Sequence, residues 1–349
     1  MRFSKILKNL KRKLLSRPRL VRVFLIFFLL FAFCFLLYSL FPLIKTVKQV
    51  VFDDKTNTLK ETNSRTNILL MGIGGGTHEG ADLTDTMIVA SITTKLDRLA
   101  IAPPIILISI PRDIYLDSLQ DKINAAYSLG KEQGIRLVLP KQIVGEITSL
   151  PIHYAAVFDF AVFEKIIDRL GGIDINVPVA FDDPEYPVAG KENDWCNGDF
   201  TLTCRYQTLH FDAGPQHLNG ARALQFVRSR KAQGNEGTDF ARSRRQQLVL
   251  AAIREKIFSL PNLLNVTVGW QIYQDLKSHI DTDFDFSSPN ELLKLALKYR
   301  QAQFVNIVLD ENQFYNPPED YRGWILLPIE GNWNEVRQFI ATKSAQLQP

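Results

Sequence analysis

The chain has 349 residues, of which 46% are hydrophobic and 22% are charged. This is a globular composition, and the length is sufficient for a large domain that needs no disulfide or metal for its stability. The formal net charge is +4, but residues 1–22 contain nine Lys or Arg and no acid, which leaves 32 basic against 37 acidic residues. The chain beyond the basic tail is therefore mildly acidic.

An apolar segment directly follows the basic tail. Residues 23–44 contain no charged side chain and are rich in Phe and Leu, and about 20 such residues cross a bilayer as a helix. Basic residues before the segment indicate a cytoplasmic N-terminus, so we expect no nucleic-acid partner for the tail. No small-x-small cleavage motif ends the segment, which favours an uncleaved anchor over a signal peptide.

Two of the three cysteines lie beyond this segment and close together. Cys34 is in the expected anchor, whereas Cys196 and Cys204 are in the part expected outside the cell. In an oxidising compartment such a pair is expected to form a disulfide. Because the closed loop is short, we expect a modest stabilisation, on the order of 2–3 kcal/mol.

Apolar runs and amphipathic stretches alternate along the rest of the chain. After a polar linker at 45–66, we expect strands at 67–71, 86–92, 105–110, 154–158 and 173–177. We expect helices at 122–129, 132–150 (interrupted at Pro140), 160–170, 217–227, 240–260 and 332–345, an irregular loop at 181–213, and mixed strand and loop at 306–329. The alternation of strands with helices predicts an α/β fold.

Glycines and two carboxylates follow the first expected strand. The stretch 72–80 lacks the last Gly of the dinucleotide fingerprint, because Thr77 stands there, and it lacks the Lys and Ser/Thr of a nucleotide P-loop. It therefore predicts either a flexible turn or a loop that lets backbone approach a ligand. Asp82 and Asp85, three residues apart, are either solvated turn acids or oxygen ligands for a hard cation.

Arginines are concentrated in two places. Arg112 and Asp113 follow a strongly apolar strand, at the end where α/β sheets bind ligands, and the planar Arg fork suits phosphate. Five arginines occur between 228 and 245: Arg228 and Arg230 share a side of an extended backbone, and one helix face would hold Arg242, Arg245 and Gln246. Such a concentration of positive charge in an acidic chain indicates an anion site, the alternative being solvated arginines.

With these residues in view, the chain resembles the LytR-CpsA-Psr family between about 67 and 256. The resemblance is carried by a set of motifs: Asp85-Thr86-Met87, Ser109-Ile110-Pro111-Arg112-Asp113, Lys122-Ile123-Asn124-Ala125-Ala126-Tyr127, Phe158-Asp159-Phe160, Leu170-Gly171-Gly172-Ile173, Leu218-Asn219-Gly220-Ala221-Arg222-Ala223-Leu224 and the block from Arg228 to Gln247. Each motif is weak alone, and together they are highly specific.

The resemblance implies an α-β-α domain with a central mixed sheet flanked by helices and an apolar pocket for a polyprenyl chain. It implies a Mg²⁺-dependent phosphotransferase that moves a glycopolymer from a polyprenyl-pyrophosphate carrier to peptidoglycan and releases polyprenyl phosphate. Asp85 would bind the metal, and the pyrophosphate would be bound by Arg112, Arg228, Arg230, Arg242, Arg245 and Gln246. Asp82 and Asp113 are the candidate general bases. The alternatives are a non-catalytic polyprenyl-pyrophosphate-binding regulator of the envelope and a lipid pyrophosphatase.

The chain departs from the family's pattern near the expected metal. An Asp commonly follows the family's first strand, where this chain has glycines, so Asp82 is the candidate for the second metal ligand. Leu83 stands where the family usually has an Arg.

The resemblance implies a single-pass protein of the bacterial cell membrane, in contact with membrane lipid. It would have a cytoplasmic tail (1–22), an anchor (23–44), a linker (45–66) and an extracytoplasmic catalytic domain (67–349) with a C-terminal extension from about 261.

Overall fold

The computed structural model describes residues 59–76, 80–94, 104–191, 193–259, 265–285, 295–318 and 322–347. The basic tail and the expected membrane anchor lie outside these ranges. Among the helices within them, none combines the length and the apolar character that a bilayer crossing requires.

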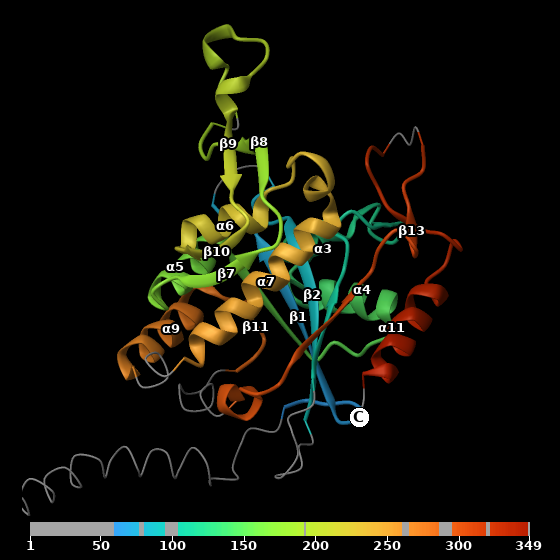
Figure 1. Cartoon of the computed structure of the whole chain (residues 1–349). Helices are drawn as coiled ribbons and strands as arrows, with labels where there is room; N and C mark the ends of the chain where they lie inside the picture. The colour runs from blue at the N-terminus through green and yellow to red at the C-terminus, as the bar shows by residue number, and fades with distance from the viewer. Residues whose placement is uncertain are drawn as a thin grey trace, which may run out of the picture. The chain divides into compact units, whose positions relative to one another are not determined.

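A six-stranded mixed sheet forms the centre of the described domain (Figure 1). Its order is β11-β6-β1-β2-β3-β12, and the strands are β1 (Arg65–Ile73), β2 (Thr84–Thr93), β3 (Ile105–Ser109), β6 (Tyr154–Asp159), β11 (Asp281–Thr282) and β12 (Phe304–Val308). β1 runs parallel to β6 and antiparallel to β2, while β3 runs antiparallel to β2 and parallel to β12. The carboxyl ends of β1, β3 and β6 and the start of β2 therefore lie along one edge.

Alternation along the strands directs side chains to two apolar layers. Leu69, Met71 and Val89 belong to the main core, on the face covered by α3 (Ala126–Glu132), α4 (Val138–Thr148) and α11 (Asn334–Gln346). The intervening Ile88 and Ala90 point to the other face, where Leu250 of α7 (Asp239–Ile257) packs against them. The structure is thus a mixed α/β fold with helices on both faces of a central sheet.

A second core lies beside the sheet, between helices and short strands. It is built from α5 (Phe160–Arg169), α6 (Gly220–Arg228), part of α7, β7 (Ile173–Val177), β8 (Phe181–Pro187), β9 (Tyr206–Phe211) and β10 (Gly214–Leu218). Phe181, Phe211 and Phe226 pack as an aromatic cluster, with ring centroids 5.1 to 5.9 Å apart. This core holds the segment from Arg228 to Arg245, which carries five arginines.

Short elements complete the described part of the chain. The remaining helices and strands are β4 (Tyr115–Leu116), β5 (Asp121–Lys122), η1 (Ile123–Ala125), η2 (Cys196–Gly198), η3 (Thr203–Arg205), η4 (Gly234–Gly237), α9 (Val266–His279), β13 (Phe314–Tyr315) and β14 (Leu327–Pro328). A disulfide joins Cys196 to Cys204, within the segment that projects from β8 and β9 (Figure 1).

Three expectations for secondary structure were wrong. Residues 181–213 are not an irregular loop, because β8 and β9 pair antiparallel across much of the segment. The segment expected as a helix at 217–227 begins as strand β10, paired with β7, and becomes helical only at Gly220. Pro140 does not interrupt a helix, because it lies in the first turn of α4, where a missing N–H costs nothing.

Candidate functional site

The carboxyl edge of the sheet brings Asp85 and Arg112 into contact. Asp85 is at the start of β2, and Arg112 follows the end of the neighbouring antiparallel strand β3. The Nη1 atom of Arg112 donates to Oδ1 of Asp85 at 2.5 Å, and Nη2 of Arg230 lies 3.7 Å from the same oxygen. Three motifs that are up to 145 residues apart in sequence, at 85, 112 and 230, therefore meet at one carboxylate.

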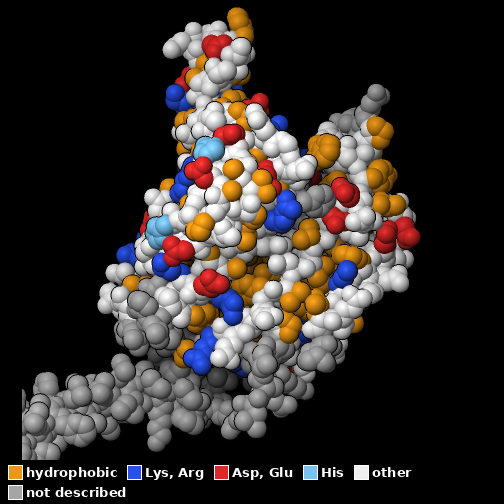
Figure 2. Space-filling model, viewed as in Figure 1, with side chains coloured by type: hydrophobic (Ala, Val, Ile, Leu, Met, Phe, Trp, Pro, Cys, Tyr) orange, Lys and Arg blue, Asp and Glu red, His pale blue; other side chains and the backbone are white. Residues whose placement is uncertain are grey.

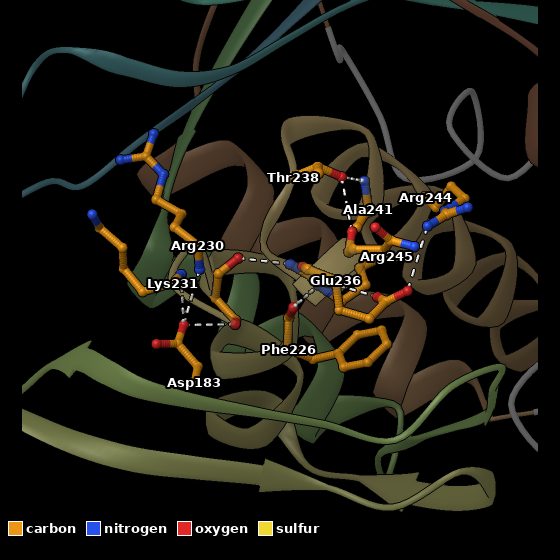
Figure 3. Close-up of polar contacts among 11 residues, drawn as sticks. Asp183, Phe226, Arg230, Lys231, Glu236, Thr238, Ala241, Arg244 and Arg245 are labelled. Atoms are coloured by element: carbon orange, nitrogen blue, oxygen red, sulfur yellow. Dashed lines mark hydrogen bonds and ion pairs between the residues drawn. The ribbon is translucent and has the colours of Figure 1, made fainter. Parts of the chain in front are cut away.

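Asp183 holds the segment that carries Arg230. Its side chain is 1% exposed, and Oδ2 accepts hydrogen bonds from the Ser229 hydroxyl at 2.7 Å and from the backbone N–H groups of Arg230 and Lys231 at 3.0 and 3.2 Å (Figure 3). The Arg230 side chain extends away from this carboxylate. Sequence reasoning missed Asp183, because its partners lie 46 to 48 residues further along the chain.

Arg245 has a position that differs from the one expected. Its side chain is 2% exposed, and its guanidinium donates to the carbonyl oxygens of Phe226, Ser229 and Glu236 at 3.0, 2.7 and 2.9 Å (Figure 3). Nη1 also donates to the Glu236 carboxylate at 3.1 Å. These bonds use each of its three nitrogens, so we correct its assignment from pyrophosphate ligand to a support for the 226–237 segment.

A cavity of about 340 Å³ opens beside the Asp85–Arg112 pair. The residues lining it come from β2, α5, β8, β9, the end of α6 and the start of α7: Asp85, Thr86, Phe160, Asp183, Glu185, Tyr186, Pro187, Tyr206, Val227, Arg228, Arg230, Lys231, Arg242 and Gln246. Nε2 of Gln246 donates to Oγ1 of Thr86 at 3.0 Å, which ties the first turns of α7 to the sheet. The cavity is therefore formed jointly by the edge of the sheet and the second core.

Positive charge is concentrated around this cavity at an electrostatic cost. Burial and repulsion from Arg242 and Arg112 lower the pKa of Arg230 to about 10. Nε of Arg112 and Nη2 of Arg230 are buried and make no hydrogen bond among the described residues, although carboxylate oxygens of Asp113 and Asp85 lie 3.4 and 3.7 Å away. Buried donors without partners are rare and costly. An anion in the cavity would accept from such donors and reduce the repulsion between the arginines.

Aromatic rings orient Arg228. The guanidinium of Arg228 lies 4.3 Å from the Phe160 ring centroid and 5.8 Å from that of Tyr186. Burial raises the pKa of the Tyr186 hydroxyl, against the opposing effect of Arg228. Such contacts hold a flexible arginine in one orientation. Phe160 and Tyr186 were not expected as site residues, since only the tertiary structure places them there.

The two other aspartates of the expected site are already paired. The Asp82 carboxylate accepts from Nζ of Lys131 at 2.7 Å. Asp113 is buried behind Arg112, between Nε of Arg112 at 3.4 Å and Nζ of Lys122 at 3.2 Å, and it does not line the cavity. Its position is that of a residue that orients Arg112 rather than of a base in contact with substrate.

Among the described residues at this edge of the sheet, Asp85 is the carboxylate that lines the cavity. Within the described ranges, the one set of three residues close enough to bind an ion is Asp194, Cys196 and Cys204, whose cysteines are already bonded to each other. No comparable set surrounds Asp85 among those residues. Mg²⁺ is commonly bound through one or two carboxylates together with substrate phosphates. Asp85 therefore fits such an ion when a phosphate supplies further oxygens.

The fold and the site together define a mixed α/β protein with an arginine-lined cavity at the carboxyl edge of its sheet. The model of the LytR_cpsA_psr family matches residues 42–318. The chain belongs to this family, as the motifs at 85, 109–113 and 228–247 had indicated.

A named relative matches this chain in sequence, and solved structures share its fold. A protein of Oceanobacillus iheyensis, named polyisoprenyl-teichoic acid–peptidoglycan teichoic acid transferase TagU, is 31% identical over 243 residues, which span 68% of this chain and 64% of the relative. The chain thus spans somewhat less than two thirds of that relative's length. The crystal structure of B. subtilis TagV matches with a TM-score of 0.54 at 24% identity, covering 83% of this chain and 100% of that structure. A structure described as TagT bound to LI-WTA matches with a TM-score of 0.53 at 20% identity, covering 82% of this chain and 94% of that structure.

Proposed function

We propose that this protein transfers a glycopolymer from a polyprenyl-pyrophosphate carrier to peptidoglycan. The observation that supports it most directly is the arginine-lined cavity, on which Nη2 of Arg230 is buried and makes no hydrogen bond within the described part of the chain. A pyrophosphate carries several oxygens at the spacing that Arg donors match. The name of the 31% identical relative describes a transfer of this kind.

The reaction is a substitution at phosphorus. A hydroxyl oxygen of the wall sugar would attack the phosphorus next to the glycopolymer, the bond to the bridging oxygen would break, and polyprenyl phosphate would leave. The hydroxyl proton passes to solvent or to a phosphate oxygen, and the product is a phosphodiester. Such reactions are accelerated by positioning and by charge stabilisation more than by covalent chemistry.

The residues of the cavity suit this chemistry. Arg112, Arg230 and Arg242 would bind the phosphoryl oxygens on which charge develops, and Arg228 would add a donor from the aromatic side. Bound through Asp85, Mg²⁺ would supply further charge neutralisation to the phosphates. The cluster of positive charge would stabilise the leaving phosphate, which needs no proton from the protein.

The lipid part of the carrier requires an apolar surface beside this cavity. Hydrophobic side chains gather over the strands next to α7 (Figure 2). On this face of the sheet Ile88 and Leu107 are buried, and Leu70, Ile105 and Phe304 are partly buried. We propose that the polyprenyl chain lies along this face, with residues 23–44 anchoring the protein in the cell membrane and the domain outside it.

The deciding experiment uses full-length protein with a radiolabelled polyprenyl-pyrophosphate-linked glycopolymer and peptidoglycan. We expect label to become covalently attached to peptidoglycan in the presence of Mg²⁺, together with release of polyprenyl phosphate. Binding of the carrier without any product would instead support a regulatory binding protein. Release of inorganic phosphate without acceptor would identify a lipid pyrophosphatase.

A further inference from the structure

A projection with exposed aromatic side chains extends from the rim of the cavity. We define the projection as residues 188–205, which connect β8 to β9. Its side chains Trp195 and Phe200 are 81% and 99% exposed, and hydrophobic atoms are visible at its far end (Figure 2). Large aromatic side chains that pack against nothing gain no folding energy from their position, and exposed apolar groups commonly mark contact surfaces.

The projection is held in a defined conformation although it contains no large core. The disulfide closes it, Asp199 accepts hydrogen bonds from the N–H and hydroxyl of Thr201 at 2.9 and 2.7 Å, and Nε of Arg205 donates to the Asp194 carbonyl at 2.8 Å. Val188 N–H also donates to the Arg205 carbonyl at 2.8 Å, at the base. A surface whose shape is fixed in advance loses less entropy on binding.

The strands that support the projection also line the cavity. Glu185, Tyr186 and Pro187 of β8 and Tyr206 of β9 are among the lining residues. A chain molecule bound along the projection would therefore end at the arginines. This continuity relates the exposed aromatics to the substrates of the site rather than to a separate partner.

Charge indicates which substrate would bind there. Residues 188–205 contain three acidic and two basic side chains, so the projection has no positive excess that would attract an anionic membrane surface or a polyanionic glycopolymer. A glycan of low charge needs no such attraction. Sugar rings present a face of C–H bonds that packs on the negative face of an aromatic ring, and their hydroxyls suit the polar groups beside Trp195 and Phe200.

We propose that the projection binds the glycan strand of the acceptor, with Trp195 and Phe200 as stacking platforms that lead the strand to the cavity. The proposal rests on the proposed function for the identity of the acceptor, but binding is measurable without any transfer reaction.

The test is cosedimentation of the full-length protein with intact, insoluble peptidoglycan, in competition with the soluble glycan strands that an amidase releases from it; the strands, which carry no peptides, should compete. We expect the Trp195→Ala/Phe200→Ala variant to bind about tenfold more weakly than the native protein, with an unchanged melting temperature. Trp324→Ala is the matched control, because Trp324 is 60% exposed and lies outside the projection; it should bind normally. A Cys196→Ser/Cys204→Ser variant should also bind more weakly, because the platform is no longer held in shape.

Equal binding by the native protein and the double aromatic variant would overturn the proposal, as would binding that requires the peptides. A second contrary result is possible in phosphatidylglycerol vesicles that contain brominated lipid. If the lipid quenches tryptophan fluorescence of the reconstituted native protein but not of the Trp195→Phe variant, Trp195 lies in the bilayer and the proposal is overturned. Transfer activity is scored separately. Glycan binding without transfer would contradict the proposed function alone, and transfer without binding through the projection would contradict this inference alone.

Discussion

At the scale of single residues, the arginines of the cavity differ in what they contact. Arg112 and Arg230 approach the Asp85 carboxylate, and each has a buried nitrogen that makes no hydrogen bond among the described residues, whereas Arg245 uses each of its nitrogens on carbonyl groups. Arg244 is exposed and near Glu236. Sequence spacing alone would group Arg244 and Arg245 with Arg112 and Arg230.

We expect Arg112→Lys to reduce transfer about as strongly as Arg230→Ala, by roughly 10²–10³-fold, because a lysine keeps the charge but lacks the planar fork. Arg244→Ala is the control and should retain near-native activity, since its side chain is 64% exposed and only loosely paired. Near-native transfer in both test variants would contradict the assigned pyrophosphate site.

We expect Asp183→Asn to destabilise the fold by about 3 kcal/mol. An amide nitrogen would face N–H and O–H donors that now share a buried carboxylate, and unsatisfied buried groups of this kind are costly. Asp182→Asn, one residue earlier on the exposed side of β8, should change stability by about 0.5 kcal/mol or less. Urea unfolding of the three proteins measures both values, and equal midpoints would exclude this role for Asp183.

At the scale of elements, the arginine-bearing helix α6 is positioned by its close approach to α5. Asn219 caps α6 by accepting from the N–H of Arg222. A Cβ atom at Gly220 would lie 2.2 Å from the carbonyl oxygen of Glu164 in α5. The two helices can therefore pack at this distance only with glycine at the contact.

We expect Gly220→Ala to destabilise the protein, although alanine is the better helix former by about 1 kcal/mol. The added methyl group would push α6 away from α5 and should also weaken transfer, since Arg228 ends this helix. Gly269→Ala in α9 is the control, because a Cβ there meets nothing within 4 Å, and it should stabilise the fold by about 0.5–1 kcal/mol. In thermal unfolding we expect a lower melting temperature for Gly220→Ala and a higher one for Gly269→Ala. A higher melting temperature in both variants would argue against a tight α5–α6 contact.

At the scale of the whole molecule, stability and ligand binding are coupled through the cavity. The pKa of Arg230 is lowered, so its charged form is disfavoured by folding, and this cost is present at neutral pH and would fade only as the pH rises through about 10. The unliganded fold thus carries the cost of keeping several cations together. An anion ligand would remove part of it.

We expect inorganic pyrophosphate with Mg²⁺ to raise the melting temperature of the native protein, corresponding to about 2.7 kcal/mol at a hundredfold excess over the dissociation constant. Arg230→Ala should lose most of this gain while being no less stable than the native protein without ligand. Raising the salt concentration should reduce the gain, and EDTA should reduce it further if Mg²⁺ binds with the phosphate. A melting temperature unaffected by pyrophosphate in the native protein would count against an anion site.

Much of the architecture follows from local patterns in the sequence. The expected strands at 67–71, 86–92, 105–110, 154–158 and 173–177 correspond to β1, β2, β3, β6 and β7, because continuous or alternating apolar side chains specify buried strands. The family motifs indicated membership in the family, which the match over residues 42–318 shows. Chemical type and spacing along the chain are sufficient for these conclusions, since they depend on near neighbours.

Only the tertiary structure decided which charged side chains face the cavity. Helical spacing places Arg242, Arg245 and Gln246 on one face, but three carbonyl groups 9 to 19 residues away draw Arg245 inward and leave the other two beside the cavity. The role of Asp183 and the pairing of β8 with β9 likewise depend on partners distant in sequence. A buried charge is stable only where such partners converge, and that convergence is a property of the folded chain.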